Sequence, residues 1–159
     1  MSITEILTLD RSEIGRHVHS KKRLFEHVSE LIANDVSHLS PDDIFHVLLS
    51  RERLGSTAVG HGVAIPHGRI KNTDSAIGAL IKLDEALPFE AIDAEPVDLF
   101  FILLVPEEAE EAHLEWLSLL AEAFSDSHLR SSLRAAKTRD VLFDTMVKAV
   151  DDIIAKRGA

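Results

Sequence analysis

Apolar and polar residues alternate along the chain in patterns that predict both helices and strands. Between residues 21 and 33 the apolar side chains recur every three or four positions, which is typical of a helix with one buried face. Residues 97–105 are almost all apolar, which is typical of a central strand covered on both sides, and Pro106 ends this run. The chain therefore contains elements of both kinds.

Residues that favour helix starts indicate three further helices. Ser40 can cap a helix, Pro41 suits its first turn, and the acidic residues 42 and 43 favour the positive end of the helix dipole. Another helix is expected after the acidic residues within positions 107–111, and Thr138 can cap the last one. The apolar stripe of the helix after position 107 is expected to consist of Leu114, Leu117, Leu120, Ala121 and Phe124. The stripe of the last helix is expected to consist of Val141, Leu142, Met146, Val147, Val150 and Ile154.

The remaining expected elements are shorter. They are one helical turn over residues 2–7, strands over 14–18 and 76–83, a short buried strand over 63–65, another near Phe89, and a short helix over 128–135. Because helices and strands mix along the chain, the sequence predicts an α/β fold in which helices pack on the faces of a sheet. No repeat or internal boundary divides the 159 residues, so we expect a single domain over residues 1–159.

Composition and charge narrow the function classes. With 27 acidic and 17 basic residues the formal charge is −10, and residues 21–23 form the only basic triplet, so we expect no nucleic-acid partner. The chain has no cysteine, which excludes disulfides, thiolate nucleophiles and cysteine metal sites. The longest apolar run, residues 99–105, is far too short for a membrane span, and the first residues do not resemble a signal peptide. We therefore expect a cytoplasmic protein without membrane insertion.

Residues 55–69, G-S-T-A-V-G-H-G-V-A-I-P-H-G-R, predict a loop of defined shape. Glycine permits a positive φ, Pro66 fixes φ, and the three apolar residues before it can anchor a short buried strand. The stretch places His67 between Pro66 and Gly68. Function concentrates on loops that a rigid scaffold holds, so His67 is the leading candidate for a functional residue.

Familiar cofactor and metal motifs do not fit this chain. A phosphate-binding P-loop requires a lysine after its second glycine, but His61 follows Gly60. A dinucleotide fingerprint requires a third glycine where Ile65 stands. The chain has no G-x-S-x-G elbow and no H-E-x-x-H helix, and the single pair Glu110 and His113 is too little for a di-metal site. We therefore expect no cofactor and no bound metal.

The imidazole of His67 can act as a general base, a metal ligand or a nucleophile. As a nucleophile toward phosphorus it has to be neutral, and the ordinary histidine pKa of about 6.5 makes the neutral form dominant in the cytoplasm. The phosphohistidine product carries negative charge, which an arginine guanidinium and glycine-rich backbone N–H groups stabilise. The residue types alone leave the three roles open.

Three blocks of sequence resemble a known family. Residues 47–69, V-L-L-S-R-E-R-L-G-S-T-A-V-G-H-G-V-A-I-P-H-G-R, closely resemble the active-site block of the IIA domains of the fructose/mannitol class in the bacterial phosphotransferase system. Residues 91–106, A-I-D-A-E-P-V-D-L-F-F-I-L-L-V-P, followed by His113 and Leu114, resemble a second block, and residues 20–26 match an early helix. The resemblance spans nearly the whole chain and implies a mixed β-sheet flanked by helices on its faces.

The resemblance implies roles for individual residues. In the A-I-P-H-G position, His67 would accept a phosphoryl group on Nε2 from an HPr-type phosphocarrier protein. Arg51 would hold the phosphoryl oxygens, and His113 would hydrogen-bond the phosphate. The residues expected to line the phosphate less directly are Thr57, Ser56, Gly68 and His61. His61 departs from the family, which favours asparagine or another small polar residue there, so its imidazole would add a donor, shift the pKa of His67 or lie in solvent. The family uses no metal for this transfer.

Residues 89–99, F-E-A-I-D-A-E-P-V-D-L, resemble the nitrogen-regulatory branch of the family more than its sugar-specific branch. That branch implies a phosphotransferase component that acts mainly as a regulator of target proteins such as potassium transporters or sensor kinases. Two alternatives stay open. One is a sugar-specific IIA component that passes phosphate to a IIB domain for fructose or mannitol uptake, and the other is a docking module without phosphoryl chemistry.

Overall fold

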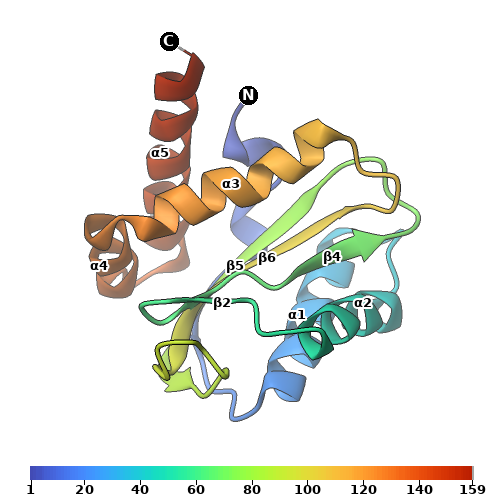
Figure 1. Ribbon diagram of the computed structural model, residues 1–159, viewed down its shortest axis with the longest axis horizontal. Coiled ribbons are helices and arrows are strands. Elements are labelled where there is room, and N and C mark those ends of the chain that lie inside the picture. The colour runs from blue at the N-terminus through green and yellow to red at the C-terminus, as the bar shows by residue number, and fades with distance from the viewer. Residues whose placement is uncertain (159) are drawn as a thin grey trace.

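One mixed sheet of six strands organises the chain, as a computed structural model describing residues 1–158 shows (Figure 1). The strands are β1 (Ser12–Arg16), β2 (Ala58–Gly60), β3 (Val63–Ala64), β4 (His67–Ile70), β5 (Ile77–Leu87) and β6 (Val97–Pro106). Their order is β1-β5-β6-β3-β2, and β4 also pairs with β6. The pairs β5–β6 and β2–β3 are antiparallel, whereas β1–β5, β3–β6 and β4–β6 are parallel, so the predicted mixed sheet is confirmed.

Helices cover both faces of the sheet, which confirms the predicted layers (Figure 1). The helices are α1 (Lys21–Asp35), α2 (Pro41–Arg53), α3 (Glu111–Ser125), α4 (Ser127–Ala135) and α5 (Arg139–Gly158), with short 3-10 turns at Ile3–Glu5 and Leu9–Arg11. The first two pack on one face, and the last three pack on the other with the first 3-10 turn. None of the helices within residues 1–158 has the length and apolar composition that a membrane span requires.

The central strand β6 serves two separate cores, as its apolar run predicts. Leu99, Phe101 and Leu103 belong to the cluster under α3, α4 and α5. Phe100, Ile102 and Leu104 belong to the cluster under α1 and α2. Successive side chains of a strand point to opposite faces, so one unbroken apolar run supplies both cores.

The predicted caps of α2 and of the N-terminal turn are present. The Ser40 hydroxyl accepts a hydrogen bond from the Asp43 N–H at 3.4 Å, with Pro41 as the first residue of α2. Ser2 and Glu5 form a capping box around the first 3-10 turn. These helix starts depend on contacts within a few residues, so they are readable from local sequence.

The short strand predicted near Phe89 is wrong. Strand β5 continues to Leu87, and residues 88–96 between the two prolines form turns and irregular chain. The Phe89 ring instead packs edge-on against Phe25 at 6.2 Å and Phe100 at 5.2 Å between ring centroids. Its apolar character therefore reflects a side chain inserted into the core from a loop.

The predicted stripe of α3 is partly wrong because this helix is apolar on two sides. The residues that it buries are Trp116, Leu119, Leu120, Ala123 and Phe124. Leu114 and Ala121 are exposed, and Leu117 is half-buried. In α5 the predicted Leu142, Met146 and Val150 are buried, whereas Val141 is exposed. Leu114 and Leu117 face a cavity described next.

Candidate functional site

A cavity of about 610 Å³ lies between α2, β4, β6 and α3. The residues that line it are His46, Val47, Ser50, Arg51 and Leu54 from α2 and its end, His67, Gly68 and Arg69 from β4, Leu103 and Val105 from β6, and Leu114 and Leu117 from α3. Three of the residues predicted from sequence, His67, Arg51 and Gly68, therefore meet in one cavity. Most of the remaining wall is apolar, and its other imidazole and cationic groups are those of His46 and Arg69.

His67 is the first residue of β4, so it lies on a strand and not on the loop that we predicted, whereas the short buried strand predicted before it is present as β3. The glycine-rich stretch folds into three short strands, β2, β3 and β4. His67 lies in register with Leu103 of β6, and the Leu103 N–H donates to the Pro66 carbonyl at 2.9 Å. The central strand thus fixes the backbone on which the imidazole is mounted.

The ring of His67 uses one nitrogen to bind its own backbone. Its Nδ1 lies 2.7 Å from the Ile65 carbonyl oxygen, which can only accept, so Nδ1 carries the proton and donates. In the neutral ring the lone pair is then on Nε2. Burial lowers the pKa of His67 and the charge of Arg51 lowers it further, while the Ile65 bond and Glu52 raise it, and the net shift is downward.

His67 is expected to titrate below its ordinary pKa of 6.5, which an NMR titration of its ring C–H signals measures. The neutral ring then persists into mild acid, so any reaction at Nε2 should fall only below pH 6.5. Between the lowered folded pKa and 6.5 the unfolded chain binds more protons than the folded chain, so the contribution of His67 to stability is present above pH 6.5 and is lost as the pH falls from there through the folded pKa. In Arg51→Ala the midpoint should rise. A wild-type midpoint at or above 6.5 would contradict this assignment.

Arg51 and Gly68 complete the polar part of the cavity. The Arg51 Nη1 donates to the Gly55 carbonyl at 2.8 Å, which holds the guanidinium by one of its five N–H donors. A Cβ atom on Gly68 would lie only 2.4 Å from Cγ1 of Val47, so a side chain here would push α2 away from β4. The two elements that carry Arg51 and His67 can approach this closely because position 68 is glycine.

Thr57 and Ser56, which we predicted to line the phosphate, do not line this cavity. The buried Thr57 hydroxyl donates to the Glu52 carboxylate at 2.6 Å. The Ser56 hydroxyl donates to the Phe89 carbonyl at 2.8 Å. Both residues act within the scaffold next to the cavity.

His61 lines a different hollow of about 490 Å³ with Asp93, Asp98 and Arg134. It is exposed, with φ of 57°, in the turn between β2 and β3. Its N–H donates to Asp93 at 2.9 Å, and its carbonyl accepts from Arg134 at 2.6 Å. His61 lines a separate hollow and does not contribute to the shift of the His67 pKa. Of the three roles left open for its imidazole, the structure therefore supports the one in which it lies in solvent.

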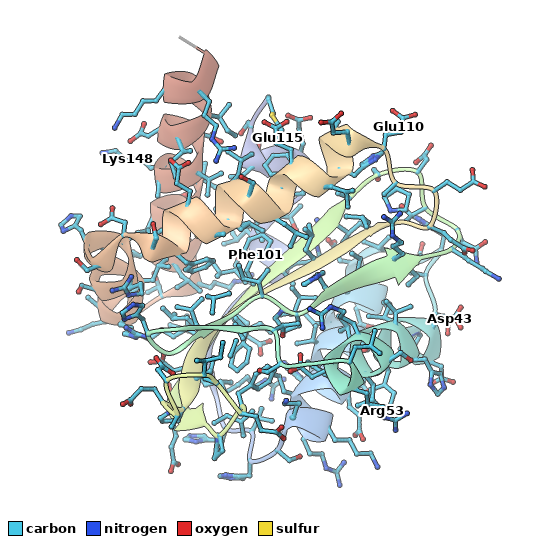
Figure 2. All side chains as sticks on the ribbon, in the orientation of Figure 1. Asp43, Arg53, Phe101, Glu110, Glu115 and Lys148 are labelled. Carbon is cyan, nitrogen blue, oxygen red and sulfur yellow. The ribbon has the colours of Figure 1, made fainter. Side chains whose placement is uncertain are left out.

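His113 lies in the first turn of α3, outside the cavity that holds His67. Its Nδ1 accepts from the Glu110 N–H at 3.1 Å, in a capping arrangement at the helix start that Figure 2 marks at Glu110. It lines a hollow of about 550 Å³ with Lys71, Asp74 and Glu107. From α3, the residues that line the His67 cavity are Leu114 and Leu117.

Sequence reasoning missed two groups of residues at this site. Leu114 and Leu117 were assigned to the core. They are three residues apart and so share one face of α3, and this face differs from the buried face formed by residues 116, 119, 120 and 123. This second apolar face was a usable signal. Glu52 and Lys21 were not proposed as site residues, and they form an ion pair of 2.9 Å in which Glu52 is buried and Lys21 is partly exposed. Within the described part of the chain, no group of three histidine, cysteine or acidic side chains has the geometry of a metal site.

Comparison with known proteins identifies the family of this chain. Residues 5–149 match the family described as "Phosphoenolpyruvate-dependent sugar phosphotransferase system, EIIA 2". The chain belongs to this family. Among its relatives are a nitrogen regulatory protein of Pseudomonas aeruginosa, 41% identical over 91% of this chain and 94% of the relative, and one of Escherichia coli, 40% identical over 90% and 88%. This IIA domain is therefore similar to nitrogen regulatory members of the family.

Solved structures agree with the fold. The nitrogen regulatory protein IIA-Ntr of Neisseria meningitidis superimposes with a TM-score of 0.82 at 47% identity, over 88% of this chain and 98% of that one. The mannitol IIA of Escherichia coli superimposes with a TM-score of 0.69 at 18% identity, over 87% and 97%. The second likeness shows the shared fold alone.

Proposed function

We propose that this IIA domain, residues 1–159, accepts a phosphoryl group on Nε2 of His67 from an HPr-type phosphocarrier in the cytoplasm. The observation that carries the proposal is the Nδ1 bond to the Ile65 carbonyl, which leaves the Nε2 lone pair for reaction in a cavity shared with Arg51. The lone pair attacks phosphorus, the P–N bond to the carrier histidine breaks, and the carrier nitrogen leaves with its electron pair.

Arg51 binds the phosphoryl oxygens in this proposal, and His113 adds a hydrogen bond to them. Arg51 is supported by its place in the cavity and by the match of a guanidinium fork to phosphate. Support for His113 is weaker, since it rests on the family resemblance and on the position of α3, whose Leu114 lines the cavity. No metal or cofactor takes part.

The phosphorylation state then regulates target proteins. The nitrogen regulatory relatives, at about 40% identity, support this role over sugar uptake. Target classes that fit the branch are potassium transporters and sensor kinases. A relative named as the 2-O-alpha-mannosyl-D-glycerate-specific EIIABC component is only 29% identical, so the sugar-specific role is the second candidate.

The proposal is tested by intact-mass analysis after incubation with phosphoenolpyruvate, the first phosphotransferase enzyme and either a nitrogen-type or a sugar-type carrier. We expect one acid-labile phosphoryl group, gained faster with the nitrogen-type carrier. Restored sugar phosphorylation in a system that lacks its own IIA would instead place the chain in the sugar branch. Absence of label with both carriers would overturn the proposal in favour of a docking module.

Arg51→Ala is expected to destabilise the phosphorylated form by about 1.5–3 kcal/mol, the range for a hydrogen bond to a charged group. Its measurement is the equilibrium ratio of phosphorylated IIA to phosphorylated carrier. The matched control is Arg53→Ala, since Arg53 is an exposed arginine on the same helix and does not line the cavity (Figure 2). Equal ratios in the two variants would exclude phosphate binding by Arg51.

A further inference from the structure

A continuous series of hydrogen bonds leads from α1 to the imidazole of His67. The Lys21 ammonium donates to Glu52 Oε2 at 2.9 Å, and the N–H and hydroxyl of Thr57 donate to the same carboxylate at 3.1 and 2.6 Å. The Thr57 carbonyl accepts from the Ile65 N–H at 3.0 Å. The Ile65 carbonyl accepts from Nδ1 of His67 at 2.7 Å. The catalytic ring is thus the last member of a series that begins on another helix.

The inner members of this series are shielded from water. The Glu52 side chain is 3% exposed, Thr57 is 5% exposed and Ile65 is 4% exposed. Breaking a bond between such groups leaves a buried donor or acceptor without a partner, which costs more than breaking an exposed bond. The series therefore resists rearrangement.

The outer end is attached to the hydrophobic core. The Lys21 ammonium lies 4.2 Å from the centroid of the Phe89 ring, a cation–π contact. Phe89 is fully buried between Phe25 and Phe100. Since Phe100 belongs to β6, the lysine that holds Glu52 is linked to the central strand through Phe89.

We infer that Glu52 is a positioning residue for the phosphoryl-accepting site, and that through Thr57 and Ile65 it holds the His67 ring in the Nδ1–H tautomer with Nε2 as the nucleophile. The consequence for phosphoryl transfer rests on the proposed function, whereas the effect on the tautomer does not.

The connection is mechanical. The N–H and the carbonyl of Thr57 belong to two different peptide groups, and so do those of Ile65, so the series transmits position more than polarisation. It fixes where the Ile65 carbonyl stands, and this oxygen selects the tautomer because only a ring N–H can donate to it. Glu52 also follows Arg51 directly, so its carboxylate links the last turn of α2 to the segment that leads to His67.

The substitution Glu52→Gln tests whether the charge of the Glu52 side chain matters, because it removes the charge and keeps the shape. Three donor groups, the Lys21 ammonium and the N–H and hydroxyl of Thr57, converge on the two carboxylate oxygens. In Glu52→Gln an NH₂ group replaces one oxygen. Opposite the Lys21 ammonium it meets a donor, and opposite the Thr57 hydroxyl it donates and reverses that bond, because a hydroxyl also accepts. The size of the side chain is kept while the charge that holds Lys21 is lost.

The test uses the full chain with ¹⁵N-labelled histidine. NMR of the unphosphorylated protein reports the tautomer of His67, and labelling by the phosphorylated carrier reports the rate of acceptance. In Glu52→Gln and Thr57→Val we expect part of the His67 population to shift to the Nε2–H tautomer, and acceptance to slow by up to about 100-fold, the effect of misplacing a reacting group. Thr57→Ser, which keeps the hydroxyl, should behave as wild type.

Lys21 and Lys22 provide a matched pair of controls. Lys21→Met removes a donor to Glu52 and should shift the tautomer, whereas Lys22→Met removes a neighbouring exposed lysine and should not. Wild-type tautomer and rate in folded Glu52→Gln would overturn the inference. If Glu52→Gln does not fold, equal tautomers in Thr57→Val and Thr57→Ser overturn it. If the wild type accepts no phosphoryl group, the proposed function fails, and the tautomer measurements still decide this inference.

Discussion

His67→Ala is expected to abolish phosphoryl labelling by an HPr-type carrier, because it removes Nε2, the nitrogen that attacks phosphorus in the proposed reaction. The ring is the group whose Nε2 is left for reaction by the Ile65 bond, and it lines the same cavity as Arg51. The cavity holds a second imidazole, His46, but its ring has no hydrogen bond to the backbone within the described residues. Intact-mass analysis after incubation with the phosphorylated carrier measures the effect as loss of the single added phosphoryl group.

Two other histidines make this experiment specific. His128→Ala removes an exposed imidazole on α4 and should leave labelling unchanged. His113→Ala should slow labelling without abolishing it if His113 supports the phosphate. Labelling that survives in His67→Ala, or that disappears only in His113→Ala, would assign the acceptor to another residue.

Phe101→Ala is expected to lower the free energy of unfolding by about 3–5 kcal/mol, the usual cost of removing a buried phenyl ring. Phe101 is fully buried in β6, under α3 (Figure 2). The ring fits against Gly78 of β5, where a Cβ atom would lie 2.8 Å from it. Because this close fit leaves no neighbour free to fill the space, the cavity should persist, and urea unfolding monitored by circular dichroism should show it.

Ile92→Ala is the control for this measurement. Ile92 is fully exposed in the irregular segment before β6, so its truncation should change the unfolding free energy by less than about 0.5 kcal/mol. A Phe101→Ala midpoint close to that of Ile92→Ala would mean that Phe101 does not stabilise the core under α3, α4 and α5 as its packing indicates.

The elements that could be predicted from sequence are those determined by local contacts or by a long unbroken pattern. The Ser40 cap and the apolar run of β6 are of this kind, and both are confirmed. Phe89 was misassigned because its burial comes from Phe25 and Phe100, which are remote in sequence. For α3, two apolar faces competed, and only the position of the sheet decides that Trp116 is buried while Leu114 is not.

The candidate site shows the same division. The motif brought out His67, Arg51 and Gly68, which do line one cavity. It could not distinguish Thr57 from a cavity residue, because the direction of that hydroxyl depends on the buried carboxylate of Glu52. Nor could it separate His113 from Leu114, since adjacent residues of one helix face different hollows.

The sharing of β6 between two cores restricts how this domain can change. A substitution along β6 alters one layer, because each side chain belongs to a single cluster. A change in the length of the strand by one residue would move every following side chain to the opposite face and exchange the contents of the two cores. It would also shift β4, whose pairing with β6 fixes His67 opposite Leu103. We therefore expect this domain to tolerate substitutions that change side-chain size along β6 far more readily than insertions or deletions within the strand.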